Sequence, residues 1–226
     1  DGYEVVEEML EGYAAANKQY VDLDLENRVV VSKLMSEEPR VRVIVGGGSG
    51  HEPMFLGYVG KDFADAAVVG NVNTSPAPDA CYEAVKAVDS GKGCLYLYGN
   101  YAGDVMNFDM AKDLAEMDGI EVDSVLVDDD IAVEDSTYTQ GRRGVAGTVL
   151  VHKIIGGMAR EGKSVAELAS YGKEVWEFMA NQVIAVKKSK DQKKLLKKSS
   201  ERSRENSIGN PAINMAYSST EWALLH

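Results

Sequence analysis

A mainly apolar run, Val41 to Val45, leads directly into the glycine-rich stretch Gly46 to Pro53, which reads GGGSGHEP. An apolar run of this length predicts a buried strand. Glycines after a strand allow positive φ angles, and the N–H groups of such a turn can bind an anion or an oxygen. His51 follows at once and can exchange a proton near neutral pH. The stretch is either a tight turn between a strand and a helix or part of a binding site, and the adjacent His-Glu-Pro favours the site.

The two familiar nucleotide-binding glycine motifs do not fit this stretch. A P-loop requires Lys-Ser or Lys-Thr after its last glycine, but His51 stands five residues after Gly46 and no such pair follows. A dinucleotide fingerprint requires Gly-x-Gly-x-x-Gly, and its third glycine position holds His51 or Pro53. The stretch therefore satisfies neither motif.

Composition narrows the class of protein. A chain of 226 residues with 45% apolar residues can form one large domain or two small ones around a sizeable core. Its net charge of −12 argues against a nucleic-acid-binding protein. Two cysteines provide neither a disulfide framework nor a zinc spacing. No apolar run reaches membrane length and the N-terminus is acidic, so we expect a soluble cytoplasmic protein.

The charge is distributed unevenly. Residues 187–204 hold nine basic and two acidic side chains, whereas the other 208 residues hold 15 basic and 34 acidic ones. Such a basic run is usually the solvated face of a helix, although it could also contact nucleic acid or an acidic partner. We therefore expect an α/β domain over residues 1–186 and a basic helical segment with a C-terminal remnant over 187–226.

Apolar periodicity predicts strands that alternate with helices. The expected helices are 2–17, 78–88, 104–117, 145–160 and 165–179, and the expected strands lie within 20–33 and at 41–45, 66–69, 93–98 and 122–127. The first helix should have Val5, Met9, Leu10 and Tyr13 on one face, and segment 20–33 can include an edge strand. Alternation of this kind predicts an α/β fold, with a mainly parallel sheet and helices on both faces.

Two side chains that can exchange protons follow separate predicted strands. Ligands of such folds bind at the carboxyl ends of the strands, where the turns after Val45, Val69, Tyr98 and Val127 should converge. His51 lies in the first of these turns, and Asp104 lies in a second glycine turn after the strand at 93–98. Together they form a plausible general-base pair for a hydroxyl group. Alternatively, each caps a helix, Asp104 as an N-cap.

Other polar residues have structural alternatives. Asp128 to Asp130 suggests magnesium, but consecutive residues of a strand point to opposite faces, so we prefer a capped strand end. Arg142 and Arg143 either bind phosphate or a partner's carboxylates, or they form surface ion pairs. His152 falls inside a predicted helix and is more plausibly structural, and the Ser/Pro stretch before Pro78 should cap the next helix.

Many motifs resemble one known family, the dihydroxyacetone-binding (DhaK) subunit of dihydroxyacetone kinase in its bacterial phosphotransferase-dependent form. The resemblance covers about residues 40 to 180. The motifs are those at 46–53, 57–61, 74–76, 100–104, 107–108, 128–133 and 138–148.

The resemblance implies a function. It implies the first lobe of the DhaK fold, a homodimer and no metal on this chain, and it makes this chain a substrate-binding subunit. A separate subunit carrying ADP/ATP and Mg²⁺ would donate phosphoryl to the triose. His51 and Asp104 would be the acid/base residues. The substrate would contact Gly47, Gly48, Ser49, Gly50, His51, Gly99 and Asp104.

Three departures from the family pattern concern capture of the substrate, and the first of them, at Gly99, supports a rival function, whereas the intact pair His51 and Asp104 supports the enzyme. Gly99 stands where the family usually has Lys, and Ile208 to Pro211 stands where a histidine normally binds the ketone covalently. The family's second lobe does not follow within the 226 residues. The rival is a non-catalytic relative that binds the triose and acts as coactivator of a transcription regulator. We also expect a backbone gap between Val186 and Ala212, at Gly209–Asn210, where a loop carrying the histidine is missing.

Overall fold

The computed structural model describes residues 2–130 and 141–188, and the side chains up to residue 178. It contains one six-stranded sheet. The strands are β1 (Val21–Asp24), β2 (Val29–Ser32), β3 (Arg42–Ser49), β4 (Ala66–Val72), β5 (Cys94–Gly99) and β6 (Val122–Val127). The helices are α1 (Val5–Ala16), the 3-10 turn η1 (Leu56–Tyr58), α2 (Pro78–Val88), α3 (Ala102–Met117), α4 (Gly147–Arg160) and α5 (Val165–Lys188).

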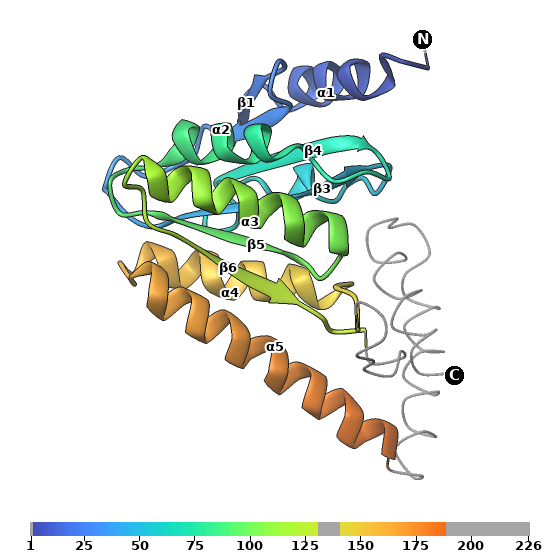
Figure 1. Cartoon of the computed structure of the whole chain (residues 1–226), viewed down its shortest axis with the longest axis vertical. Coiled ribbons are helices and arrows are strands. Elements are labelled where there is room, and N and C mark those ends of the chain that lie inside the picture. The colour runs from blue at the N-terminus through green and yellow to red at the C-terminus, as the bar shows by residue number, and fades with distance from the viewer. Residues whose placement is uncertain (1, 131–140, 189–226) are drawn as a thin grey trace.

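The sheet is mainly parallel, as the alternation of strands and helices predicts. Its strand order is β1-β2-β4-β3-β5-β6. Strands β4, β3, β5 and β6 are parallel to one another, whereas β2 pairs antiparallel with β4 and β1 pairs antiparallel with β2. The segment 20–33 therefore forms a hairpin, and β1 lies at one edge of the sheet (Figure 1).

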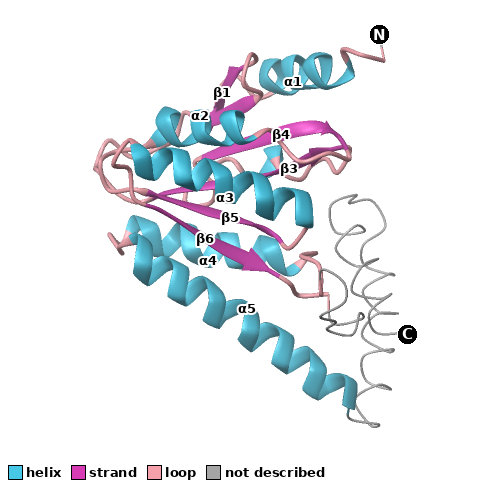
Figure 2. Ribbon diagram, viewed as in Figure 1, coloured by secondary structure: helices cyan, strands magenta, loops and turns pink. Residues whose placement is uncertain are grey.

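Helices cover both faces of the sheet, as expected (Figure 2). Side chains alternate between faces along a strand, so Tyr96 and Tyr98 of β5 pack with α2 and α3, while Leu95 and Leu97 pack with α4 and α5. Helix α1 and the segment around η1 pack against β1, β2, β3 and β4 on the α4 side of the sheet. The central strands are thus buried on both faces, which is typical of parallel sheets.

The element boundaries follow the sequence closely, with a few differences. Helix α2 and strand β6 have the predicted ends, whereas α5 continues to Lys188. In α1, Val6 and Leu10 are buried and Val5 is 47% exposed, so the predicted place of Val5 on the apolar face is wrong. Within the described residues, no helix combines the length and apolar character needed to cross a membrane. The predicted backbone gap at Gly209–Asn210 lies outside the described residues.

A buried ionic network joins the starts of β3 and β4. Asp65, only 2% exposed, accepts hydrogen bonds from both terminal nitrogens of Arg40 at 3.0 and 2.6 Å. The Asp65 carboxylate also accepts the N–H of Val43 at 2.9 Å, and Arg42 lies 3.6 Å from it. The backbone N–H of Asp65 donates to the carbonyl of Val43 at 2.7 Å. One carboxylate therefore ties the segment before β4 to the first residues of β3.

Replacement of Asp65 by Ala should lower the free energy of unfolding by about 3–5 kcal/mol, because two buried guanidinium groups lose their counter-ion. Chemical denaturation measures the change. Asp123→Ala is the matched control, since its ion pair with Lys112 at 3.1 Å is partly exposed. The control should lose about 1 kcal/mol or less. Equal losses in the two variants would contradict a structural role for the buried network.

Candidate functional site

Strand β3 continues through the first three glycines of the glycine-rich stretch. Gly46, Gly47 and Gly48 are buried strand residues, and only Gly50 has a positive φ, +97°. The prediction of a turn beginning at Gly46 is therefore wrong. These glycines are needed for close packing: an added Cβ at Gly46 would lie 2.6 Å from the carbonyl oxygen of Val68, and one at Gly48 would lie 2.7 Å from the Thr74 nitrogen.

The segment after β4 folds down onto these glycines. Added Cβ atoms at Gly48 and at Gly70 would both collide with the backbone of Thr74. The Ser49 hydroxyl donates to the carbonyl of Gly70 at 2.7 Å, and the N–H of Asn73 donates to the carbonyl of Ser49 at 2.8 Å. The ends of β3 and β4 are thus joined by main-chain contacts, as expected for turns that converge at the carboxyl ends of parallel strands.

Asp104 lies in the first turn of α3 and not at its N-cap. The N-cap is Tyr101, whose side chain makes no capping hydrogen bond, so the alternative that Asp104 is the N-cap is wrong. The carboxylate is buried, with a relative exposure of 8%, and it accepts a short hydrogen bond from the Ser75 hydroxyl. One turn further along α3, the Asn107 side chain donates to the carbonyl of Pro76 at 2.7 Å. Helix α3 therefore holds the segment after β4 at two points.

The structure brings the two predicted proton-exchanging residues to the same edge of the sheet. Burial raises the pKa of Asp104 above its ordinary value, while the Ser75 hydrogen bond and the charge of His51 act in the opposite direction. His51 is therefore close enough for its charge to act on the carboxylate. Its side chain is exposed, and the centroids of its ring and of the Phe55 ring lie 6.5 Å apart. A buried carboxylate beside an exposed imidazole is suited to proton transfer with a bound hydroxyl group.

Gly99 ends β5 in close contact with Gly144. An added Cβ at Gly99 would lie 3.2 Å from the Cα of Gly144 and 3.1 Å from the Tyr101 ring. The Asn100 amide donates to the carbonyl of Arg142 at 2.8 Å, and the Tyr101 hydroxyl donates to that of Gly144 at 3.1 Å. A side chain at position 99 would require these neighbours to move by a few tenths of an ångström, so Gly99 is closely packed and carries no side chain into the site.

The aspartates after β6 bind backbone groups. Asp129 accepts the N–H groups of Val145 and Gly147, both at 2.7 Å, and so satisfies free donors at the start of α4. Asp130 pairs with Arg143 at 3.1 Å. Within residues 2–130 and 141–188, no group of three His, Cys, Asp or Glu side chains is arranged to hold a metal. These contacts favour the capped strand end over magnesium, and for Arg143 they favour an ion pair.

His152 is buried inside α4, as the structural interpretation predicts. Its Nε2 lies 3.0 Å from the Leu97 carbonyl oxygen, and its ring packs against Tyr58 and Phe63. Burial lowers the pKa of His152 to about 3, so the imidazole is neutral at physiological pH. It takes no part in the candidate site.

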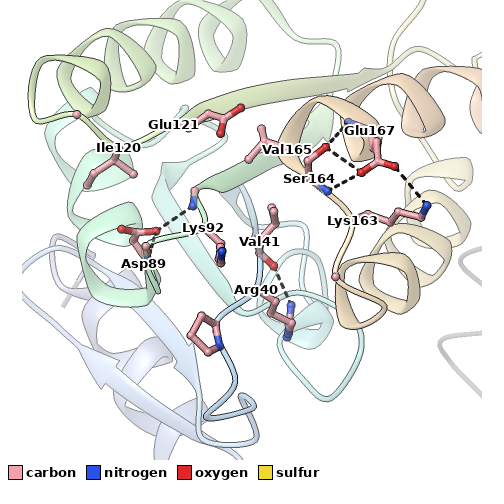
Figure 3. A pocket seen from close by; sticks show the side chains of 15 residues that line it. Arg40, Val41, Asp89, Lys92, Ile120, Glu121, Lys163, Ser164, Val165 and Glu167 are labelled. Atoms are coloured by element: carbon pink, nitrogen blue, oxygen red, sulfur yellow. Dashed lines mark hydrogen bonds and ion pairs between the residues drawn. The ribbon is translucent and has the colours of Figure 1, made fainter.

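The hollow shown in Figure 3 lies at the opposite end of the strands. It has a volume of about 520 Å³ and is lined by the turns that precede β3, β5, β6 and α5. Its polar groups bind one another: Asp89 accepts the N–H groups of Gly91 and Gly93, and Lys163 pairs with Glu167 at 3.2 Å. The candidate site is therefore the converging carboxyl ends and not this hollow.

Sequence reasoning missed Ser75 and Asn107 as parts of the site. The Ser/Pro stretch is predicted to cap α2, but the N-cap of α2 is Ala77, no side chain caps it, and Pro78 occupies its first turn. The hydroxyl of Ser75 is directed to Asp104 instead. This contact joins residues 29 positions apart, so no local pattern reveals it.

Gly48→Ala should destabilise the protein by about 1–3 kcal/mol, the usual cost of overpacking, because its Cβ meets the backbone of Thr74. Thermal or chemical denaturation measures this. Gly157→Ala in α4 is the control: nothing lies within 4 Å of its added Cβ, and a helical Gly→Ala change usually stabilises by about 0.5–1 kcal/mol. A Gly48→Ala protein as stable as the wild type would disprove the close packing.

Comparisons with known proteins find close relatives. The sequence profile of the Dak1 domain matches residues 11–209. The dihydroxyacetone-binding subunit DhaK of PTS-dependent dihydroxyacetone kinase 2 from Listeria innocua is 68% identical over 163 residues, 72% of this chain and 49% of that protein. The corresponding subunit of the PEP-dependent kinase of Escherichia coli is 41% identical over 175 residues, 77% of this chain and 49% of that protein. The chain thus spans about half the length of these relatives.

Solved structures share the fold. The native form of the dihydroxyacetone kinase of C. freundii gives a TM-score of 0.71 at 36% identity, covering 77% of this chain and 32% of that one. A structure described as the dihydroxyacetone kinase operon co-activator Dha-DhaQ gives a TM-score of 0.68 at 37% identity, covering 73% of this chain and 50% of that one. The same fold is therefore found both in a kinase and in a co-activator.

Proposed function

Since this chain belongs to the Dak1 domain family, we propose that it is the substrate-binding part of a dihydroxyacetone kinase. It presents dihydroxyacetone for phosphorylation by a separate subunit that carries the nucleotide. The observation that supports this best is the buried carboxylate of Asp104, held by Ser75 and within electrostatic reach of His51. These groups lie at the carboxyl ends of parallel strands, where α/β folds bind their ligands.

The roles of the residues follow from their surroundings. One substrate hydroxyl donates a hydrogen bond to Asp104, whose burial strengthens that bond. His51 accepts the proton of the hydroxyl that receives the phosphoryl group. We assign contacts with the substrate oxygens to Gly47, Gly48, Ser49 and Gly50 at the end of β3, and to Gly99, which adds no side chain there.

The partners are also part of the proposal. The glycine-rich stretch fits no nucleotide motif, so we assign ADP/ATP and Mg²⁺ to the partner subunit, where they supply the phosphoryl group. We expect this subunit to meet the exposed His51 side chain. A cytoplasmic homodimer, as expected from the resembling family, completes the assembly.

A second candidate function is a dihydroxyacetone-binding co-activator of a transcription regulator. It is favoured by Gly99, because the family usually has Lys at this position. The solved co-activator also has this fold. The two candidates differ in one measurable property, which is turnover of dihydroxyacetone in the presence of the nucleotide-carrying subunit.

His51→Ala should reduce turnover of dihydroxyacetone by about 10²-fold or more, the usual scale for loss of a general acid or base. Asp104→Asn should act similarly. The assay combines full-length protein with the nucleotide-carrying subunit, ATP and dihydroxyacetone, and Lys173→Ala on the exposed surface of α5 is the control. A wild-type protein that binds dihydroxyacetone but shows no turnover would instead favour the co-activator.

The rate of phosphorylation should fall on the acid side as Asp104 takes up a proton. The pKa of this carboxyl is raised by burial, so protonation begins at a higher pH than for an exposed aspartate. The contribution of ionised Asp104 to the rate is therefore fully present above that pKa and is lost as the pH falls through it. The pH dependence of kcat/KM measures this, and an acid limb that remains unchanged in Asp104→Asn would assign the limb to another group.

A further inference from the structure

The Ser75 hydroxyl occupies one of the two oxygens of the Asp104 carboxylate. It donates to Oδ1. A free carboxylate with two equivalent oxygens can rotate and accept a donor at either one. A hydrogen bond to Oδ1 removes this freedom, because rotation of the carboxylate would break it. The oxygen that faces the substrate is thereby defined.

The segment that carries Ser75 is held between α3 and the ends of β3 and β4. The Asn107 amide donates to the Pro76 carbonyl at 2.7 Å, so α3 binds the segment on both sides of the Ser75–Pro76 peptide. Beneath it, Gly48 and Gly70 allow the backbone of Thr74 to lie directly on the strands. At Gly103, an added Cβ would lie 3.1 Å from the Ser75 hydroxyl oxygen. Ser75 is therefore supported by backbone packing and does not depend on a mobile side chain.

Besides burial, the groups that change the pKa of Asp104 are Ser75 and His51. The thiol of Cys81 on α2 and the phenols of Tyr98 on β5 and Tyr101 before α3 all have pKa values raised by burial. They remain uncharged near neutral pH. His51, on the segment after β3, acts through its charge, and Ser75, on the segment after β4, acts through its hydrogen bond.

We propose that Ser75 is a positioning residue: it orients the Asp104 carboxylate, with Asn107 fixing the segment that carries it, so that a single carboxylate oxygen meets the substrate hydroxyl. This role rests on the proposed function, in which Asp104 binds that hydroxyl. Ser75 also stabilises the ionised carboxylate, since a hydrogen bond donated to a carboxylate favours its charged form.

Ser75→Ala tests the role. Loss of a hydrogen bond to a charged group should lower kcat/KM for dihydroxyacetone by about tenfold or more. The acid limb of kcat/KM should also move to higher pH, because the ionised carboxylate loses a donor. Asn107→Ala leaves the Ser75 hydroxyl in place and removes only the hydrogen bond to the Pro76 carbonyl. It should lower kcat/KM and move its acid limb to higher pH, each by less than Ser75→Ala does. A loss of activity with an unmoved acid limb in Ser75→Ala would overturn the proposal in favour of a purely structural role.

Thr74→Val is the matched control. It removes a hydroxyl from the same segment, but that residue is exposed, and among the described residues its hydroxyl donates to the Val72 carbonyl at 3.3 Å and not to Asp104. It should leave the rate and the pH limb as in the wild type. An effect of Thr74→Val equal to that of Ser75→Ala would show that the segment, and not the bond to Asp104, is responsible.

A second measurement does not depend on turnover. The carboxyl carbon of Asp104 can be followed by NMR during a pH titration of the full-length protein and assigned by its absence in Asp104→Asn. Its pKa should be higher in Ser75→Ala than in the wild type. An inactive wild type would refute the kinase function while leaving this test intact, and an identical pKa in both proteins would refute the role of Ser75.

Discussion

The carboxylate of Asp65 determines how the two central strands begin. It accepts hydrogen bonds from Arg40 and from the backbone N–H of Val43 and lies close to Arg42, all at a buried position, while the backbone N–H of Asp65 donates to the Val43 carbonyl. Buried charges tolerate few arrangements, because an unpaired one is costly. The register of β3 against β4 follows from this contact: Ile44 lies opposite Ala66, and Gly48 lies opposite Gly70.

That register places small residues where the site requires them. Gly48 and Gly70 become neighbours at the far ends of their strands, and the backbone of Thr74 rests on both. A shift by one residue would break the pairing of Gly48 with Gly70 on which the backbone of Thr74 rests, and it would move Ser75 relative to Asp104. The geometry of the candidate site is therefore linked to an ionic network at the opposite end of the sheet, through the pairing of two parallel strands.

The sequence predicts much of the fold, because apolar periodicity and turn residues are local properties. The mainly parallel sheet, the two helical layers and the ends of α2 and β6 follow from them. The ordered motifs from residue 40 to 180 predict the family, which the Dak1 domain match confirms. The continuation of β3 through Gly46 is missed because a glycine serves equally for a turn and for close packing, and sequence alone does not separate these uses.

The site is predicted less completely, because part of it depends on tertiary contacts. His51 and Asp104 can be proposed because each follows a strand, and the structure places both at one edge of the sheet. The bond from Ser75 to Asp104 depends on the tertiary packing of a segment and a helix, so it has no signature in the chain. Two predictions stay untested because residues 189–226 are not described: the missing histidine loop near Ile208 to Pro211, and the domain boundary after Val186.

The floor of the site is made of main chain, and this affects how such a protein can acquire new specificities. Every replacement of Gly48 or Gly70 adds at least one carbon, and the nearest backbone leaves no room for it. A substitution at either position therefore costs stability before it can reshape the site. Exposed side chains at the same edge carry no such packing cost. Any change of specificity is thus easier to make at the entrance than in the floor.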